Sequence, residues 1–166
     1  WADVPWIAVL DPEITTSTMR GYYVVYLFSI DMKRVYLSLN QGMTDIETEL
    51  KTEGAAKELS RRAEFIRDRI PEFKNNFEYK LIDLSIKLSG NTTRPYLYEK
   101  GHACGREYDF SKNLDEEQLI KDLNNILSLY SLLSYKGGID TDSTEDDYKP
   151  SEGLTTLKEM RQYKTH

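Results

Sequence analysis

The first half of the chain opens with a hydrophobic pattern typical of β-strands. Residues 21–29 are continuously apolar and aromatic, residues 31–33 form a polar corner, and apolar and polar positions alternate over residues 34–39. This pattern predicts a β-hairpin. Because the first strand of the pair is apolar on both faces, we expect it to be central in its sheet and covered on both sides. The second strand alternates, so we expect it to be more exposed.

Two helices are predicted to follow the hairpin. Thr44, with Glu47 three residues later, matches a capping box, which predicts a helix that begins at Asp45. A second helix is predicted over residues 55–70, and it ends before Pro71 because proline cannot continue a helix. Basic and acidic residues alternate along this second helix, which indicates a surface of ion pairs.

The second half of the chain mixes further strand signals with one long helix. Apolar and polar positions alternate over residues 79–88, which predicts a half-buried strand, and residues 96–100 are a candidate for another short strand. The helix that begins after Asp115 carries an apolar stripe at three- and four-residue steps, and Gly137 and Gly138 end it. Strands followed by helices, without a β-α-β rhythm, predict an α+β fold: a mostly antiparallel central sheet flanked by helices.

Length and charge bear on the domain organisation. The 166 residues suit one compact domain of a longer protein, which we place at residues 1–136. Residues 137–166 are acidic and poor in apolar residues, so we expect a linker, with a short helix over residues 154–164 that leads to an effector domain. The net charge is −6; four basic and seven acidic residues follow Lys136, which leaves 18 basic and 21 acidic residues before it. This balance disfavours general binding of polyanions, so a DNA-binding surface would need its cations gathered on one face.

Several kinds of chemistry are disfavoured by what the sequence lacks. One cysteine and two histidines argue against a disulfide framework and against a zinc site, and they suit a reducing cytoplasm. No glycine-rich phosphate loop occurs, so we expect no nucleotide cofactor. No apolar run reaches the roughly 18 residues that a membrane helix needs, and we therefore expect no membrane partner.

Two groups of residues are candidates for catalysis. His102 and Cys104 flank one alanine and would share a face on a strand, although a buried structural cysteine is the alternative. Glu72, Glu78 and Lys80 resemble the carboxylate and lysine pattern of metal-dependent nucleases, although E-x-K triplets are common in a highly charged chain. A metal-dependent nuclease therefore stays open as an alternative function, as does an RNA-binding or protein-interaction module.

Four segments carry a resemblance to a known family. They are residues 1–10 (WADVPWIAVL), 21–28 (GYYVVYLF), 35–42 (VYLSLNQG) and 98–104 (YEKGHAC), the last leading to the helix after Asp115. In this order they resemble the N-terminal DNA-binding domain of the McrB family of methylcytosine-dependent (type IV) restriction proteins. The likeness covers roughly residues 1–136.

The resemblance implies a function and a set of site residues. It implies a non-catalytic module that binds double-stranded DNA containing methylated cytosine, extrudes the modified base into an aromatic pocket, and targets a downstream motor or nuclease domain. It also implies that a segment ahead of the Pro-Trp motif helps to occupy the gap left by the base. Apolar strand residues of these types are also common in cores, so a structural role stays open for each of them. The implied pocket residues are Trp6, Tyr23, Leu27 and Tyr98.

Contacts to the DNA backbone are expected from basic residues in loops or at the ends of elements, where long side chains can reach phosphates. An ordinary solvated charge is the alternative at each of these positions. The candidates are Arg20, Arg94, Lys100 and Arg106.

Overall fold

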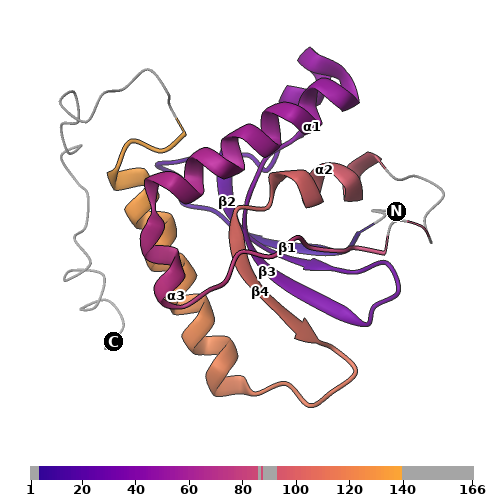
Figure 1. Ribbon diagram of the computed structural model, residues 1–166, viewed down its shortest axis with the longest axis vertical. Helices are drawn as coiled ribbons and strands as arrows, with labels where there is room; N and C mark the ends of the chain where they lie inside the picture. The colour runs from indigo at the N-terminus through magenta and orange to yellow at the C-terminus, as the bar shows by residue number, and fades with distance from the viewer. Residues whose placement is uncertain (1–3, 86, 88–92, 140–166) are drawn as a thin grey trace.

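The computed structural model describes residues 4–85, 87 and 93–139 (Figure 1). Three expected features lie wholly or partly outside the described residues. They are residues 1–3 of the N-terminal segment 1–10, most of the linker, and the helix over residues 154–164. Within the described part, no helix is long and apolar enough to cross a membrane.

A four-stranded antiparallel sheet forms the centre of the fold. Its strands lie in the order β1-β2-β3-β4, so β2 and β3 are internal and β1 and β4 are the edges. The predicted hairpin and the central position of its first strand are confirmed. The expectation that the second strand is more exposed is wrong, because β4 pairs with its other edge and helices cover both faces. The strands are β1 (Trp6–Val9), β2 (Tyr22–Phe28), β3 (Arg34–Gln41) and β4 (Cys104–Asp109).

Helices cover the two faces of the sheet, which gives the predicted α+β class (Figure 1). One face, which we call the α1 face, carries α1, α2 and the extended residues 77–85. The other, the α3 face, carries α3, where Tyr22 of β2 meets Tyr130 edge to face with ring centroids 5.8 Å apart. The helices are α1 (Thr44–Arg69), the short 3-10 helix η1 (Pro71–Asn75), α2 (Thr93–Gly101) and α3 (Glu116–Tyr135).

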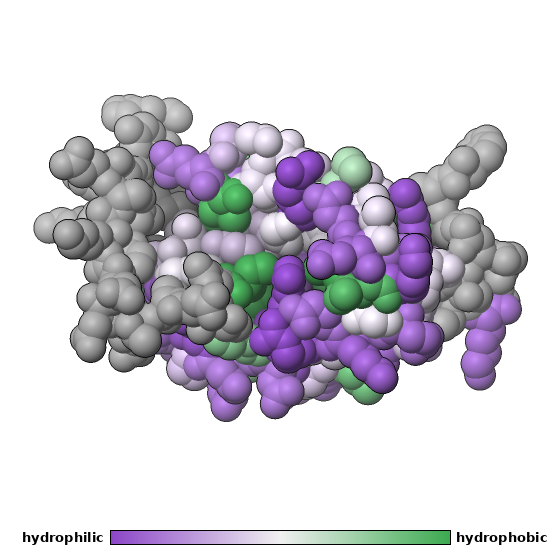
Figure 2. All heavy atoms as spheres, turned by 90° about the horizontal axis from the view of Figure 1, so that it is seen from above, coloured by the Kyte–Doolittle hydropathy of each residue, from purple (hydrophilic) through white to green (hydrophobic). Residues whose placement is uncertain are grey.

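The two helices predicted after the hairpin are one element with a break. α1 begins at Thr44, but no side chain caps its first turn, so the predicted capping box does not form. The helix is interrupted at Lys51, whose backbone has φ 62° and ψ 178°. The expected ion pairs occur where Arg61 and Arg62 both contact Glu58, at 2.7 and 2.8 Å. Seen from the side where α1 begins, the surface is mostly hydrophilic, with small separate hydrophobic patches (Figure 2).

Two strand predictions in the second half are wrong. Of residues 79–88, those that the structure describes form no sheet ladder; Ile82 and Leu84 are buried and Leu81 is 81% exposed, so the alternation reflects an extended segment lying across the sheet. Residues 96–100, predicted as a short strand, belong to helix α2. Neither segment can pair with β3, because β2 and β4 already occupy the two edges of that strand.

The last helix follows its prediction closely. The Asp115 side chain accepts hydrogen bonds from the backbone N–H groups of Glu117 and Gln118, as an N-cap residue does. At the other end, Gly137 and Gly138 have φ values of 99° and 68°. The Gly138 N–H donates to the Leu133 carbonyl at 2.8 Å, which ends the helix in the left-handed turn that glycine permits.

Candidate nucleic-acid interface

The four aromatic and apolar pocket candidates all lie on the α1 side of the sheet. Trp6 of β1 is paired with Leu27 of β2, and Tyr23 is on the same face of β2, since residues two and four apart share a face. Tyr98 lies in α2, which is held over this face by a hydrogen bond of 3.1 Å from the Asn40 side chain to the Tyr98 carbonyl. Tyr23 is paired with Asn40, so Tyr23 and Tyr98 are neighbours.

The same four residues differ sharply in exposure. Tyr23, Leu27 and Tyr98 are 1%, 0% and 6% exposed, whereas Trp6 is 37% exposed on an edge strand. The Tyr23 hydroxyl donates to the Thr18 carbonyl at 2.9 Å. Burial raises the pKa of Tyr23, and the neighbouring Tyr98 adds to the rise. Three of the candidates therefore belong to the core in this structure, and Trp6 is the one that solvent reaches readily.

Two of the four cation candidates lie beside the first turns of α1. Arg20 contacts Asp45 at 3.1 Å, and both side chains are largely exposed. Arg94, at the start of α2, lines a hollow that we call the α1–α2 hollow, with a volume of about 460 Å³. Lys51, at the break in α1, lines the same hollow and was not among the candidates from the sequence. The hollow is lined by Met43, Thr44, Glu47, Thr48, Lys51, Thr52, Thr93 and Arg94.

The other two cation candidates lie elsewhere. Lys100, in the last turn of α2, lies over the Tyr96 ring with its ammonium nitrogen 5.4 Å from the centroid. Arg106 of β4 is held by Asp122 of α3 at 2.9 Å and donates to the Asn76 carbonyl at 2.7 Å. Its guanidinium therefore serves the packing of α3 and η1 against β4. The structure does not bring the four cations together on one surface.

A second hollow, which we call the β4 cleft, lies between residues 74–82 and the edge strand β4. Its volume is about 510 Å³, and its lining includes the cations Lys74, Lys80 and Arg106. Lys80 contacts Glu78 at 3.3 Å and Arg106 is paired as described, so two of the three cations are already engaged. Glu107 on the same wall adds a further negative charge.

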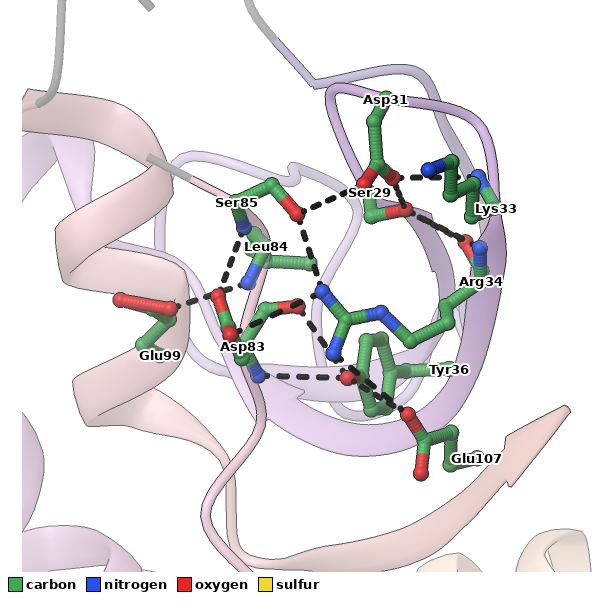
Figure 3. Close-up of polar contacts among 10 residues, drawn as sticks. All are labelled: Ser29, Asp31, Lys33, Arg34, Tyr36, Asp83, Leu84, Ser85, Glu99 and Glu107. Atoms are coloured by element: carbon green, nitrogen blue, oxygen red, sulfur yellow. Dashed lines mark hydrogen bonds and ion pairs between the residues drawn. The ribbon is translucent and has the colours of Figure 1, made fainter. Parts of the chain in front are cut away.

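A polar network holds residues 83–85 against the hairpin (Figure 3). Arg34 reaches Asp83 at 3.6 Å and Glu107 at 3.7 Å, and it donates to the Ser85 hydroxyl at 2.9 Å. Glu99 of α2 accepts from the Leu84 N–H at 3.0 Å, and burial raises the pKa of this carboxyl. The network therefore fixes α2 and the extended segment on the α1 face, the face of β2 that carries Tyr23 and Leu27.

The residues considered for catalysis have structural partners. His102 Nδ1 lies 2.6 Å from the Ser38 hydroxyl, and burial lowers the pKa of His102 to about 3. Burial also raises the pKa of the Cys104 thiol to about 12. Glu72 contacts Lys136 at 2.8 Å, at the opposite end of η1 from the exposed pair of Glu78 and Lys80. Among the described residues, no three His, Cys, Asp or Glu side chains gather closely enough to hold a metal ion.

The structure is an α+β domain with an exposed aromatic side chain, Trp6, on an edge strand and a cation-lined hollow between α1 and α2. Comparison with family models adds the particular family: residues 1–135 match the MrcB-like, N-terminal domain. The chain therefore belongs to this family and is a DNA-binding module of the McrB type, as found in type IV restriction. Searches of curated proteins and of solved structures found no match.

Proposed function

We propose that this domain reads a methylated cytosine in double-stranded DNA by flipping the base out of the duplex, and thereby targets a restriction effector, a motor or a nuclease, in the cytoplasm. The observation that carries the proposal is Trp6: a large aromatic side chain that is 37% exposed on the same sheet face as Tyr23, Leu27 and Tyr98. The effector acts after binding, so this domain itself contributes recognition.

A flipped base loses its stacking in the duplex and needs a flat partner in the protein. Aromatic stacking contributes about 1–3 kcal/mol per base. Trp6 suits this role because its ring lies at the edge of the sheet, where a base can arrive without crossing the core. Leu27 lies directly opposite Trp6 on β2. It is fully buried in this structure, so a cytosine methyl group would contact it only after the base has entered beside Trp6. That methyl contact is worth roughly 0.8 kcal/mol, or about fourfold in affinity.

Tyr23 and Tyr98 take a different part in this proposal. Tyr23 lies four residues from Leu27 along β2, a distance of about 13 Å, which is longer than one pyrimidine ring. A base that stacks on Trp6 therefore reaches these tyrosines only if it enters deeply between α2 and the sheet. We propose that they form the back wall of the pocket and that α2 moves when the base enters. This movement requires the hydrogen bonds of Tyr98 with Asn40 and of Glu99 with Leu84 to open.

The test is a fluorescence-anisotropy titration at fixed moderate salt with matched duplexes. The duplexes carry cytosine, 5-methylcytosine, 5-hydroxymethylcytosine or N6-methyladenine at one position. We expect tighter binding to a modified cytosine, and we expect Trp6→Ala to weaken that binding by about 5- to 150-fold, the equivalent of one stacking contact.

Ile7→Ala is the matched control for Trp6→Ala. Ile7 is 58% exposed on the same strand, and its side chain points to the opposite face of the sheet. We expect Ile7→Ala to bind all four duplexes as the parent domain does. Equal binding of cytosine and every modified duplex by the parent domain would overturn the proposed specificity. Unchanged selectivity in Trp6→Ala would remove Trp6 from the pocket.

A further inference from the structure

We infer that the α1–α2 hollow is the place where this domain grips the phosphates of DNA, and that Lys51 and Arg94 are the two cations that contact them. The inference rests on the DNA-binding function and adds a surface and a residue, Lys51, to it. The hollow lies between the first half of α1 and the start of α2. These helices cover the face of the sheet to which Trp6 belongs by its pairing with Leu27.

Charge separates this hollow from the β4 cleft. In the part of the chain that the structure describes, neither Lys51 nor Arg94 forms an ion pair, and both side chains are exposed. In the β4 cleft, by contrast, Arg106 is paired with Asp122 and Lys80 with Glu78. A cation that already has a carboxylate partner must give it up to bind a phosphate, which reduces its gain. The α1–α2 hollow is therefore the better phosphate site.

The remaining lining of the hollow also suits a phosphodiester. Threonine side chains in the lining contribute hydroxyl groups, which can donate hydrogen bonds to phosphate oxygens. One of them, the Thr48 hydroxyl, already donates to the Thr44 carbonyl at 2.9 Å. The volume of about 460 Å³ has room for a phosphate with its two sugars. Glu47 is the one carboxylate in the lining, and its charge opposes the binding of an anion.

The hollow also lies beside the proposed base pocket. Arg94 precedes Tyr98 by four residues in α2, so the two side chains lie on one face of the helix, one turn apart. Burial raises the pKa of Tyr98, and the charge of Arg94 opposes this rise, as expected for close neighbours. A nucleotide whose base enters toward Tyr98 therefore carries its own phosphates past Arg94.

The experiment uses charge-removing variants of the whole chain in the same anisotropy titration, over a series of salt concentrations. We expect Lys51→Gln and Arg94→Gln each to weaken binding of methylated and unmethylated duplexes by the same factor, roughly five- to tenfold at 0.1 M salt. Each should also reduce the slope of log K against log salt by about 0.9, the effect of losing one phosphate contact. Glu47→Gln should strengthen binding to both duplexes, a gain that misfolding cannot produce.

Matched controls lie on the same helix outside the hollow. Lys57→Gln and Glu49→Gln make the same charge changes at exposed positions of α1 that do not line the hollow. The inference is overturned if the Lys51 and Arg94 variants behave like Lys57→Gln, or if Glu47→Gln behaves like Glu49→Gln. Failure of the base-reading proposal is distinguishable, because the two duplexes would then bind equally while the hollow variants still weakened both.

Discussion

Lys51 interrupts α1 with a backbone conformation that side-chain-bearing residues avoid. Its φ of 62° and ψ of 178° lie in a region that is essentially restricted to glycine and costs about 1–3 kcal/mol for other residues. Lys51→Gly removes this strain, but the flexible unfolded chain gains about 0.5–1 kcal/mol of conformational entropy. We therefore expect a net stabilisation of about 0.5–2 kcal/mol. DNA binding should weaken at the same time, because one of the two cations of the hollow is lost.

Urea unfolding followed by circular dichroism measures this change, with Lys51→Ala as the control. Alanine removes the same charge but keeps a β-carbon, so the strain stays and the free energy of unfolding should change little. Both variants should lose the same affinity for DNA, so that stability and binding separate between them. A Lys51→Gly domain that is destabilised by about 1 kcal/mol, as for glycine inside an ordinary helix, would refute the strain argument.

Three further predictions concern pH and reactivity. The folded-state pKa of His102, about 3, is far below its unfolded value of 6.5. The free energy of unfolding should therefore fall by up to about 1.4 kcal/mol per pH unit as the pH drops from 6.5 toward 3. In urea titrations, His102→Gln should lose this pH dependence. Hydrogen bonds from Arg61 and Arg62 lower the pKa of Glu58 to about 2. Glu58→Gln should therefore lower the free energy of unfolding by at most about 1 kcal/mol at neutral pH. This difference from the parent domain should vanish as the pH falls from 4.5 through 2. Cys104 is buried with its pKa raised to about 12, so a thiol reagent at neutral pH should label it only at the rate of unfolding, and fast labelling of the native domain would contradict its burial.

The parts of the fold that the sequence predicted are those with local causes. The hairpin followed from continuous and alternating apolar positions, and α3 followed from its stripe, its Asp115 cap and its terminal glycines. The prediction of a strand over residues 79–88 was wrong, because an extended segment with one buried side shows the same alternation of apolar and polar residues as a strand. Such a segment needs no partner strand. β4 was not predicted, since Gly105 and the charged Arg106 and Glu107 weaken its pattern and pairing with β3 decides its conformation.

The site could be predicted only in part, for the same reason. Parity along β2 correctly placed Tyr23 and Leu27 on one face, but burial depends on α2, which the sequence pattern presented as a strand. Arg94 stands out in the sequence because it lies in a polar stretch where the strand pattern of residues 79–88 ends. Lys51 lies in a charged run between the two helices that the sequence predicted, so a break was expected there. Nothing in that run indicates that the break falls at Lys51 or that a hollow lies beside it. Arg106 was expected to face DNA, yet its partner Asp122 comes from a helix that only the tertiary fold brings near.

The acidic balance of the chain sets how such a domain can recognise DNA. Several of its cations form ion pairs with carboxylates within the fold. Examples are Arg34, Arg106 and Lys136. A surface that neutralises 6–10 phosphates loses about 10³–10⁵ in affinity between 50 and 200 mM salt. Two contacts, from Lys51 and Arg94, predict a slope of log K against log salt near −2 and a loss of about 12-fold over the same range. Phosphate contacts alone therefore hold DNA weakly and without regard to sequence. If the domain reads the base as we propose, most of the affinity for a modified site comes from the base itself, so that selectivity depends on Trp6 while the hollow adds a smaller contribution that is the same for all DNA.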